Sequence, residues 1–286
     1  MKNITILAFL ICLSNFSFAQ NVQYDGFKMP ESAAEGPNGD IYVSEIGERD
    51  KDGDGKISKI DKEGNISSFA TGLYDPKGIV FYKEKLYVTD RDVIIEVNMD
   101  GTWSVLGSTM AFPKTPVFLN DIDVDINGDF YITDTGNFET GGIVFKMNLA
   151  GDITVLFDEN TENNKAPNGV LPIGNNKILL LDWGGELFEA DTINKKLVKL
   201  GEGFPGGDGL AIRNNTIYIS SWKEGKIYEF KDGNSKVIAE GFEAAADIAL
   251  TKDKKHLIIP DMKGGTVTLF PLKKESLLNK LKSIFK

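Results

Sequence analysis

Six polar or charged residues stand at the same position of an internal repeat, and their side chains could hold a metal ion. They are Glu31, Lys77, Asn120, Asn168, Asp208 and Asp247. The set offers three carboxylates, two amides and one ammonium, with no histidine or cysteine among them. Oxygen donors of mixed charge favour a hard cation, and Ca²⁺ suits them better than Zn²⁺. The chemistry predicted for these positions is therefore calcium binding.

The repeat is defined by a predicted β-hairpin that begins at each of these residues. In the copy from Asn120 to Asp134, the strand sequences DIDVDI and DFYIT meet at an Asn127-Gly128 turn. A second predicted hairpin follows, and the copies begin about 40 to 48 residues apart. Units of four antiparallel strands at this period are typical of propeller blades. The sequence therefore predicts an all-β fold, a six-bladed β-propeller.

The predicted blades must close into a ring, because open strand edges would pair with other chains. The last copy, residues 246–271, contains only three predicted strands. We expect the start of the mature chain, around residues 22–27, to supply the missing strand. In a propeller the first strand of each blade lines the central tunnel. The six repeated residues should therefore meet at one mouth of that tunnel.

Residues 1–19 are predicted to be a signal peptide. Lys2 precedes an apolar run of about ten residues, and Ser17 and Ala19 are the small residues expected before a cleavage site. The run is too short to span a bilayer. We therefore expect an exported protein, periplasmic or extracellular after cleavage. The single cysteine, Cys12, lies within this segment, so the mature chain forms no disulfide.

Residues 20–272 are expected to form the propeller and residues 273–286 a basic amphipathic tail. In the tail, Leu277, Leu281 and Phe285 recur at helical spacing between lysines. A helix that caps the propeller is favoured over one that lies on an anionic membrane. The net charge of −10 argues against nucleic-acid binding, which needs a basic surface. We expect a monomer that binds a small-molecule substrate.

Short motifs at four of the repeated positions connect the chain with a known family. They are Glu31-Ser32, Asn120-Asp121, Asn168-Gly169 and Asp208-Gly209, in this order along the blades. With them the chain resembles the senescence-marker-protein/gluconolactonase family of six-bladed propellers, which includes regucalcin. The resemblance implies one Ca²⁺ bound by Glu31, Asn120, Asn168 and Asp208. It also implies calcium-dependent hydrolysis of a lactone or related ester, with Asp208 as base or nucleophile.

Other motifs depart from this family. Pro116 to Leu119 precede Asn120, where sugar lactonases of the family often carry an arginine, and this argues against a polar sugar lactone. Pro30-Glu31 and Pro76-Lys77-Gly78 also resemble NHL repeats, whose propellers are often binding modules without a metal. The alternative function is therefore a non-catalytic module that binds a ligand or a protein.

The loops after the second strand of each blade should lie on the face that carries the metal. They contribute Arg91, Phe138, Trp183, Trp222 and Met262. Aromatic rings above an ion would form an apolar specificity pocket, in which Trp183 and Trp222 bind substrate together with Asn120 and Lys77. Packing between blades is the alternative role of the rings. It is favoured for Trp183, and for Trp222 neither role is favoured.

The first of these loops contains the start of a calcium-loop motif. Asp50, Asp52, Asp54 and Gly55 give the pattern D-x-D-x-D-G, with Ser58 at the ninth position. An EF-hand is excluded, because the flanks are predicted strands and the twelfth position is not glutamate. Two interpretations stay open. Asp50, Asp52, Asp54 and Ser58 hold a second, structural Ca²⁺, or the segment is a solvated acidic loop.

The register of the repeat distinguishes two glutamates in the first blade. Glu35 begins an E-G-P motif that looks like a metal-binding motif of the family. The alignment nevertheless places Glu35 level with Val124, about 13 Å along the strand from the ligand position, whereas Ca²⁺ ligands lie at about 2.4 Å. Glu31 is therefore the predicted ligand. Glu35 is expected to line the tunnel deeper down or to pair with a neighbouring blade.

Overall fold

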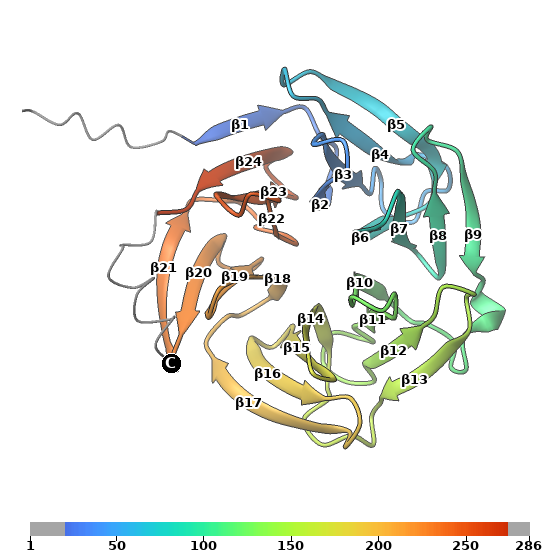
Figure 1. Cartoon of the computed structure of the whole chain (residues 1–286), viewed down its shortest axis with the longest axis vertical. Helices are drawn as coiled ribbons and strands as arrows, with labels where there is room; N and C mark the ends of the chain where they lie inside the picture. The colour runs from blue at the N-terminus through green and yellow to red at the C-terminus, as the bar shows by residue number, and fades with distance from the viewer. Residues whose placement is uncertain (1–20, 274–286) are drawn as a thin grey trace, which may run out of the picture.

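The computed structural model describes residues 21–273, which fold into six four-stranded antiparallel sheets around a central axis (Figure 1). The predicted fold class, an all-β six-bladed propeller, is confirmed. The one helix within residues 21–273 is the short 3-10 helix η1 (Thr109–Ala111). The expected signal peptide and all but the first residue of the expected tail lie outside the described residues. Residues 21–273 contain no helix of the length and apolarity needed to cross a membrane.

Five blades are built from four consecutive strands, counted here from the tunnel outwards. Blade one contains β2 (Pro30–Glu35), β3 (Ile41–Glu45), β4 (Gly55–Ile60) and β5 (Ile66–Leu73). Blade two contains β6 (Pro76–Tyr82), β7 (Lys85–Asp90), β8 (Val93–Val97) and β9 (Trp103–Gly107). Blade three contains β10 (Leu119–Val124), β11 (Phe130–Asp134), β12 (Ile143–Met147) and β13 (Ile153–Phe157). Blade four contains β14 (Pro167–Gly174), β15 (Lys177–Asp182), β16 (Glu186–Asp191) and β17 (Lys196–Glu202). Blade five contains β18 (Gly207–Arg213), β19 (Thr216–Ser221), β20 (Lys226–Lys231) and β21 (Asn234–Glu240).

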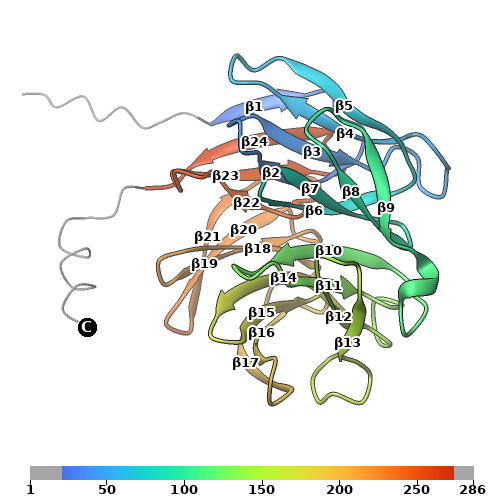
Figure 2. The ribbon, with the colours of Figure 1, turned by 45° about the vertical axis from the view of Figure 1, so that its right-hand side comes forward.

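Blade six combines strands from the two ends of the described chain. Its three inner strands are β22 (Ala249–Leu250), β23 (His256–Asp261) and β24 (Thr266–Pro271), and its outer strand is β1 (Val22–Asp25). β1 runs antiparallel to β24, with Val22 opposite Leu269 and Asp25 opposite Thr266. Figure 2 shows the blue β1 beside the red β24. The ring is thus closed by pairing between early and late residues.

The strands follow the expected local chemistry of alternating apolar residues and tight turns. In blade three, Gly128 has a φ of 90°, a conformation that glycine adopts at little cost. The side chain of Asp125 accepts hydrogen bonds from the backbone N–H groups of Asn127 (2.8 Å) and Asp129 (3.0 Å). Asp and Asn stabilise turns in this way. The turn fixes the register of β10 and β11, and with it the position of Asn120.

The apolar core is divided into clusters, each of which joins two neighbouring blades. Between blades two and three, for example, Tyr87 and Ile94 pack with Phe130 and Phe145. Five similar clusters lie at the other blade contacts. Each blade therefore depends on both of its neighbours for burial of its apolar surface. This arrangement holds the six inner strands at fixed positions around the tunnel.

Phe27 is expected to contribute strongly to the stability of the closed ring. Its side chain is buried in the cluster between blades six and one, and its N–H donates to the Gly265 carbonyl at 3.1 Å. We expect Phe27→Ala to lower the free energy of unfolding by about 3 kcal/mol, as is usual when a buried phenylalanine is truncated. Urea denaturation measures this change.

Val22→Ala is the matched control, because Val22 lies in the same closing segment and is 47% exposed. We expect this control to change the free energy of unfolding by less than about 0.5 kcal/mol. Equal effects of the two variants would contradict a role for Phe27 in holding the ring closed.

Candidate functional site

Each innermost strand begins with the same irregularity of register, and this irregularity positions the repeated residues. In blade three, Leu119 faces Asp134 and Ile122 faces Ile132, so the inner strand has one extra residue between the two pairs. The other five blades also have one extra residue at this point. Bulges of this kind redirect side chains. The bulged segments contain Glu31, Lys77, Asn120, Asn168, Asp208 and Asp247.

The acidic residue at the end of the second strand holds the backbone that leads into the inner strand. Asp134 accepts hydrogen bonds from the N–H groups of Val117 (2.6 Å) and Phe118 (2.9 Å). Such bonds to a carboxylate are about twice as strong as neutral ones. The equivalent acids bind the backbone in the same way, namely Glu45, Asp90, Asp182 and Asp261. These recurring acids are therefore structural, and they set the path of the chain just before each tunnel residue.

Hydroxyl groups and glycines fix the tunnel residues at close range. The hydroxyl of Thr89 donates to the carbonyl of Asn120, and that of Thr133 to the carbonyl of Asn168, both at 2.5 Å. At Gly169, a Cβ atom would lie only 2.3 Å from the carbonyl oxygen of Asp208. A side chain there would push two inner strands apart. The glycine of the Asn168-Gly169 pair is thus required by the narrow tunnel.

A pocket of about 310 Å³ opens at this mouth of the tunnel. It is lined by five of the six repeated residues together with loop residues from the blades. Its lining is Glu31, Ile46, Arg49, Asp50, Asp75, Lys77, Phe118, Asn120, Phe138, Asn168, Trp183, Asp208, Trp222 and Met262. The structure therefore gathers in one pocket all four predicted metal ligands and all four predicted substrate-binding residues.

The donor atoms in this pocket fit a hard cation. Glu31 Oε2 and Asn168 Oδ1 are buried and have no hydrogen-bond partner, which is costly unless a cation or water occupies the space beside them. The amide nitrogen of Asn120 donates to the hydroxyl of Thr135 at 3.0 Å, which leaves the amide oxygen for a ligand. Within residues 21–273, no group of three or more His, Cys, Asp or Glu residues is arranged to hold a metal. The candidate set instead combines two carboxylates with two amides.

Electrostatics at the site also favour added positive charge. Burial raises the pKa of Glu31 well above its usual value, and the nearby carboxylate of Asp208 adds to this effect. Burial, followed by the charge of Asp121, likewise raises the pKa of Asp208. These carboxylates are therefore difficult to ionise together while they are buried side by side. A divalent cation between them would offset the repulsion.

Three further acids, Asp121, Asp123 and Asp247, lie deeper in the tunnel. Asp121 accepts hydrogen bonds from the N–H groups of Ile122 (2.7 Å) and Val170 (2.8 Å), and burial raises its pKa to about 7. Asp247 accepts a hydrogen bond from the Ser32 hydroxyl at 2.5 Å, and its N–H donates to the Glu31 carbonyl at 2.9 Å. Asp121 and Asp247 line a separate cavity of about 210 Å³ on the other side of the tunnel. They therefore support the pocket from below.

Lys77 is a buried cation on the wall of the same pocket. Its ammonium donates to the backbone carbonyl of Asp75 at 3.3 Å and lies 4.5 Å from the centroid of the Phe118 ring. Burial lowers the pKa of Lys77, while the carboxylates of Glu31, Asp75 and Asp90 oppose this effect. Lys77 thus offsets part of the negative charge of the tunnel and faces the aromatic side of the pocket.

Four aromatic rings form a continuous arc on one side of the pocket, which we call the aromatic arc. Its successive centroid distances are 4.7 Å for Phe118–Phe138, 5.3 Å for Phe138–Trp183 and 5.7 Å for Trp183–Trp222. The rings are half-buried. They therefore pack against rings of neighbouring blades and also line the pocket. Substrate binding by Trp183 and Trp222 stays a prediction.

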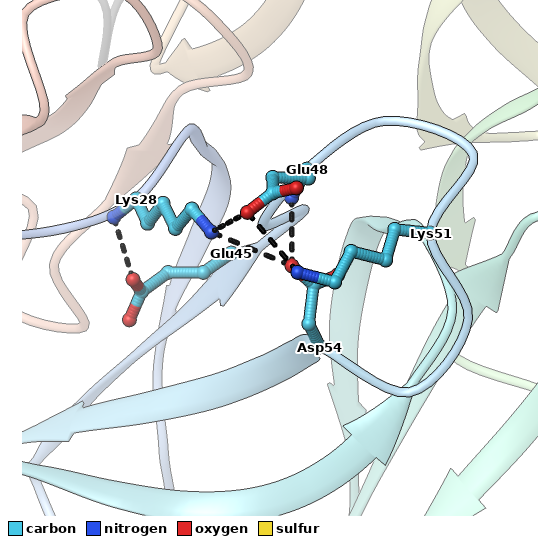
Figure 3. Close-up of polar contacts among 5 residues, drawn as sticks. All are labelled: Lys28, Glu45, Glu48, Lys51 and Asp54. Atoms are coloured by element: carbon cyan, nitrogen blue, oxygen red, sulfur yellow. Dashed lines mark hydrogen bonds and ion pairs between the residues drawn. The ribbon is translucent and has the colours of Figure 1, made fainter.

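The acidic loop of blade one engages two lysines (Figure 3) and, through Asp52, an arginine. Asp54 lies 3.4 Å from the ammonium of Lys28 and 3.6 Å from that of Lys51, and Glu48 contacts the same two lysines. Asp52 binds Arg91 at 2.6 Å, which takes Arg91 away from the pocket lining.

The other residues expected to hold a second Ca²⁺ in this loop lie in different surroundings. Asp50 lines the tunnel pocket. The hydroxyl of Ser58 donates to Glu45 inside blade one. One oxygen of Asp54, Oδ1, is buried without a hydrogen-bond partner. A second Ca²⁺ on Asp50, Asp52, Asp54 and Ser58 stays a prediction.

Glu35 pairs with a neighbouring blade, one of the two roles expected for it. Its carboxylate accepts a hydrogen bond from the Lys252 N–H of blade six at 2.8 Å. Sequence reasoning missed Arg49, Asp75 and Phe118, which line the pocket. Asp75 and Phe118 both lie two residues before a repeated tunnel residue, so their spacing was a signal that could have identified them.

Comparisons with known proteins show that this chain shares its fold with solved structures. No protein-family model matches the sequence, and no curated protein matches it. Solved structures that resemble the chain include a gluconolactonase from Xanthomonas campestris, with a TM-score of 0.71, 16% identity, and coverage of 87% of this chain and 88% of that chain. A calcium-binding regucalcin from Agrobacterium tumefaciens has a TM-score of 0.67 and 15% identity, with coverage of 85% of this chain and 90% of that chain. An auxiliary nutrient binding protein from Bacteroides thetaiotaomicron has a TM-score of 0.64 and 12% identity, with coverage of 85% of this chain and 69% of that chain. The structural neighbours thus include proteins described as a gluconolactonase, as a calcium-binding protein and as a nutrient binding protein.

Proposed function

We propose that this chain is an exported calcium-dependent hydrolase that opens a lactone or a related ester at the tunnel pocket. The observation that carries the proposal is the pair of buried, unpartnered oxygens on Glu31 and Asn168, beside Asp208 at the base of an open pocket. The gluconolactonase and regucalcin among the structural neighbours support the same class of function. The signal-peptide motif in residues 1–19 supports export.

Glu31, Asn120, Asn168 and Asp208 would hold the ion. Bound Ca²⁺ supplies a Lewis acid that polarises a carbonyl and stabilises negative charge on its oxygen. Asn120 is held by Thr135 and by Thr89, so its amide oxygen is fixed in direction. Such preorganisation is what an efficient site requires.

Asp208 is the residue that would carry out the proton transfer or the attack. Burial and the charge of Asp121 raise the pKa of Asp208, and a Ca²⁺ ion held beside it would offset this effect and favour the ionised carboxylate. An ionised Asp208 would therefore be free to take a proton from an attacking water or to attack the carbonyl carbon itself. Lys77, Trp183 and Trp222 would bind the rest of the substrate from the pocket wall.

The test of the proposal is a panel of lactones and aryl esters assayed with and without a chelator. We expect turnover of at least one compound, its loss in EDTA, and its recovery when excess Ca²⁺ is added. EDTA saturated with Ca²⁺ beforehand is the control for effects of the chelator itself. Turnover that is insensitive to EDTA would refute the calcium mechanism.

A binding module is the second candidate function. The aromatic arc at an open pocket is a feature of ligand-binding sites, and a nutrient binding protein is among the structural neighbours. The same panel separates the two candidates. Absence of turnover across all lactones and esters would favour the binding module.

A further inference from the structure

We propose that the ligand of the tunnel pocket is a neutral aromatic lactone or aryl ester that carries a hydroxyl group on its ring. The inference rests on the proposed hydrolase function and names its substrate class. Three features carry it: the continuous aromatic arc, the mixed-charge wall that faces it, and the size of the pocket. A volume of about 310 Å³ suits one or two fused rings rather than a polymer.

The aromatic arc favours a flat apolar body. The rings of Phe118, Phe138, Trp183 and Trp222 contact one another edge to face or tilted, at interplanar angles of 49° to 64° and centroid distances of 4.7 to 5.7 Å, and a ligand ring can join them by the same kind of contact. Aromatic contacts add to the effect of apolar burial. A polyhydroxylated sugar lactone would lose hydration of its hydroxyl groups against these rings without gaining hydrogen bonds. The arc therefore selects an aromatic ring over a sugar.

Lysines fix the orientation of the two tryptophans. The ammonium of Lys223 lies 4.9 Å from the Trp183 ring centroid, and that of Lys263 lies 4.1 Å from the Trp222 ring centroid. A cation over an aromatic face stabilises the ring in that position. Trp183 and Trp222 are thus held in place before a ligand binds, which reduces the entropy lost on binding.

The wall of blade two offers one hydrogen-bond donor and one acceptor close to the end of the arc. The Asp75 carboxylate is buried, lines the pocket, and has an oxygen, Oδ1, without a partner. The neighbouring ammonium of Lys77 donates to the Asp75 carbonyl and lies over Phe118, the first ring of the arc. A hydroxyl group can donate to a carboxylate oxygen and accept from an ammonium at once. A phenolic or alcoholic hydroxyl on the ligand ring would satisfy both groups.

The charge of this wall argues for a neutral ligand. The carboxylates of Glu31, Asp75 and Asp90 act on Lys77, and Arg49 adds positive charge. With Ca²⁺ held by Glu31, the carboxylates of Asp75 and Asp90 would still repel a ligand carboxylate placed at Lys77. A neutral hydroxyl avoids this repulsion.

Ring recognition can be tested by binding, with lactams that resist hydrolysis. The aromatic probe is 3,4-dihydro-2-quinolone. The matched non-aromatic probe is 2-piperidone, which has the same lactam ring without the fused benzene ring. The Trp103→Phe variant makes tryptophan fluorescence specific to the pocket, since the chain has three tryptophans and Trp103 lies on β9, bonded to Thr71 at 3.0 Å. In this background with Ca²⁺, we expect the quinolone to bind at least about tenfold more tightly than 2-piperidone.

Phe138→Leu tests the aromatic arc without removing either pocket tryptophan. We expect it to weaken quinolone binding about fivefold and to leave 2-piperidone binding unchanged. Phe69→Leu is the matched control, because Phe69 packs on Tyr42 outside the pocket. Equal affinity for the two lactams, or equal effects of the two variants, would overturn the aromatic part of the proposal.

The hydroxyl group is tested with the ring-hydroxylated isomers of the same quinolone. We expect one isomer to bind about tenfold more tightly than the unsubstituted compound, since hydrogen bonds to charged groups are strong. Asp75→Asn should remove most of that gain and leave the unsubstituted quinolone unaffected. No gain for any isomer, or a gain that survives Asp75→Asn, would overturn the hydroxyl part.

Turnover of the corresponding lactones separates failure of this inference from failure of the hydrolase function. Dihydrocoumarin, δ-valerolactone and D-glucono-δ-lactone share a six-membered lactone ring and differ in their substituents. Turnover without preference for dihydrocoumarin would support the hydrolase and overturn the substrate class. Tight binding of the quinolone without turnover of any lactone would contradict the hydrolase and support the aromatic ligand class.

Discussion

Replacing Asp208 with asparagine is expected to lower kcat/KM by at least about 10³-fold while the fold stays intact. An amide can still donate an oxygen to a cation, but it cannot accept a proton or act as a nucleophile, and general-base catalysis alone contributes about 10² to 10⁴. Loss of the negative charge also weakens stabilisation of the bound ion. Steady-state kinetics on the best compound of the lactone and ester panel measures the effect, and circular dichroism checks the fold.

Asp123→Asn is the matched control for this variant. Like Asp208, Asp123 lies on an inner strand, here β10, but it lines the cavity on the other side of the tunnel, away from the pocket. The substitution is chemically identical, and we expect it to leave kcat/KM close to the parent value. If Asp208→Asn retained parental rates, Asp208 would have no role in the chemistry.

Glu31→Gln is expected to weaken Ca²⁺ binding by about 100-fold or more, because affinity depends on the number of charged ligands. The loss corresponds to about 2.7 kcal/mol. Glu31 is buried with a free oxygen at the pocket, so its charge can act directly on the ion. Isothermal titration calorimetry with Ca²⁺ measures the affinity.

Glu35→Gln provides the comparison within the same strand. Both substitutions remove one negative charge from β2, but Glu35 is engaged by the backbone of Lys252 at the other end of the strand. We expect its Ca²⁺ affinity to stay near the parent value. The reverse ranking of the two variants would show that the repeat alignment of blade one is wrong.

The arrangement of the blades could be predicted because the repeat expresses a simple physical rule. Each blade needs a tight turn, alternating apolar residues and a bulge at the tunnel, and the sequence around Asn127-Gly128 shows the first two openly. Counting residues from the second strand then placed Glu31, rather than Glu35, at the pocket. Counting works here because each blade has one extra residue at the same point.

The walls of the pocket could be predicted only in part. Trp183 and Trp222 were identified from their loops, but whether a ring packs or faces a pocket depends on neighbours in other blades. The spacing of Asp75 from Lys77 could have placed it near the tunnel, but only the folded structure reveals its unpartnered oxygen. The acidic loop illustrates the same limit, since Asp52 meets Arg91, a residue of another blade.

The pairing of β1 with β24 has a consequence for how the molecule is made. A chain that emerges from its amino end presents β1 long before its partner strand exists, because Val22 faces Leu269. Blade six therefore cannot form until nearly all of the described sequence is available, and contacts of such long separation slow folding. Until then, the apolar side of blade one that packs against blade six stays uncovered, and exposed surface of this kind promotes aggregation. We therefore expect the nascent chain to be prone to aggregation until β24 is available, and the paired β1 and β24 to limit fraying once the ring has closed.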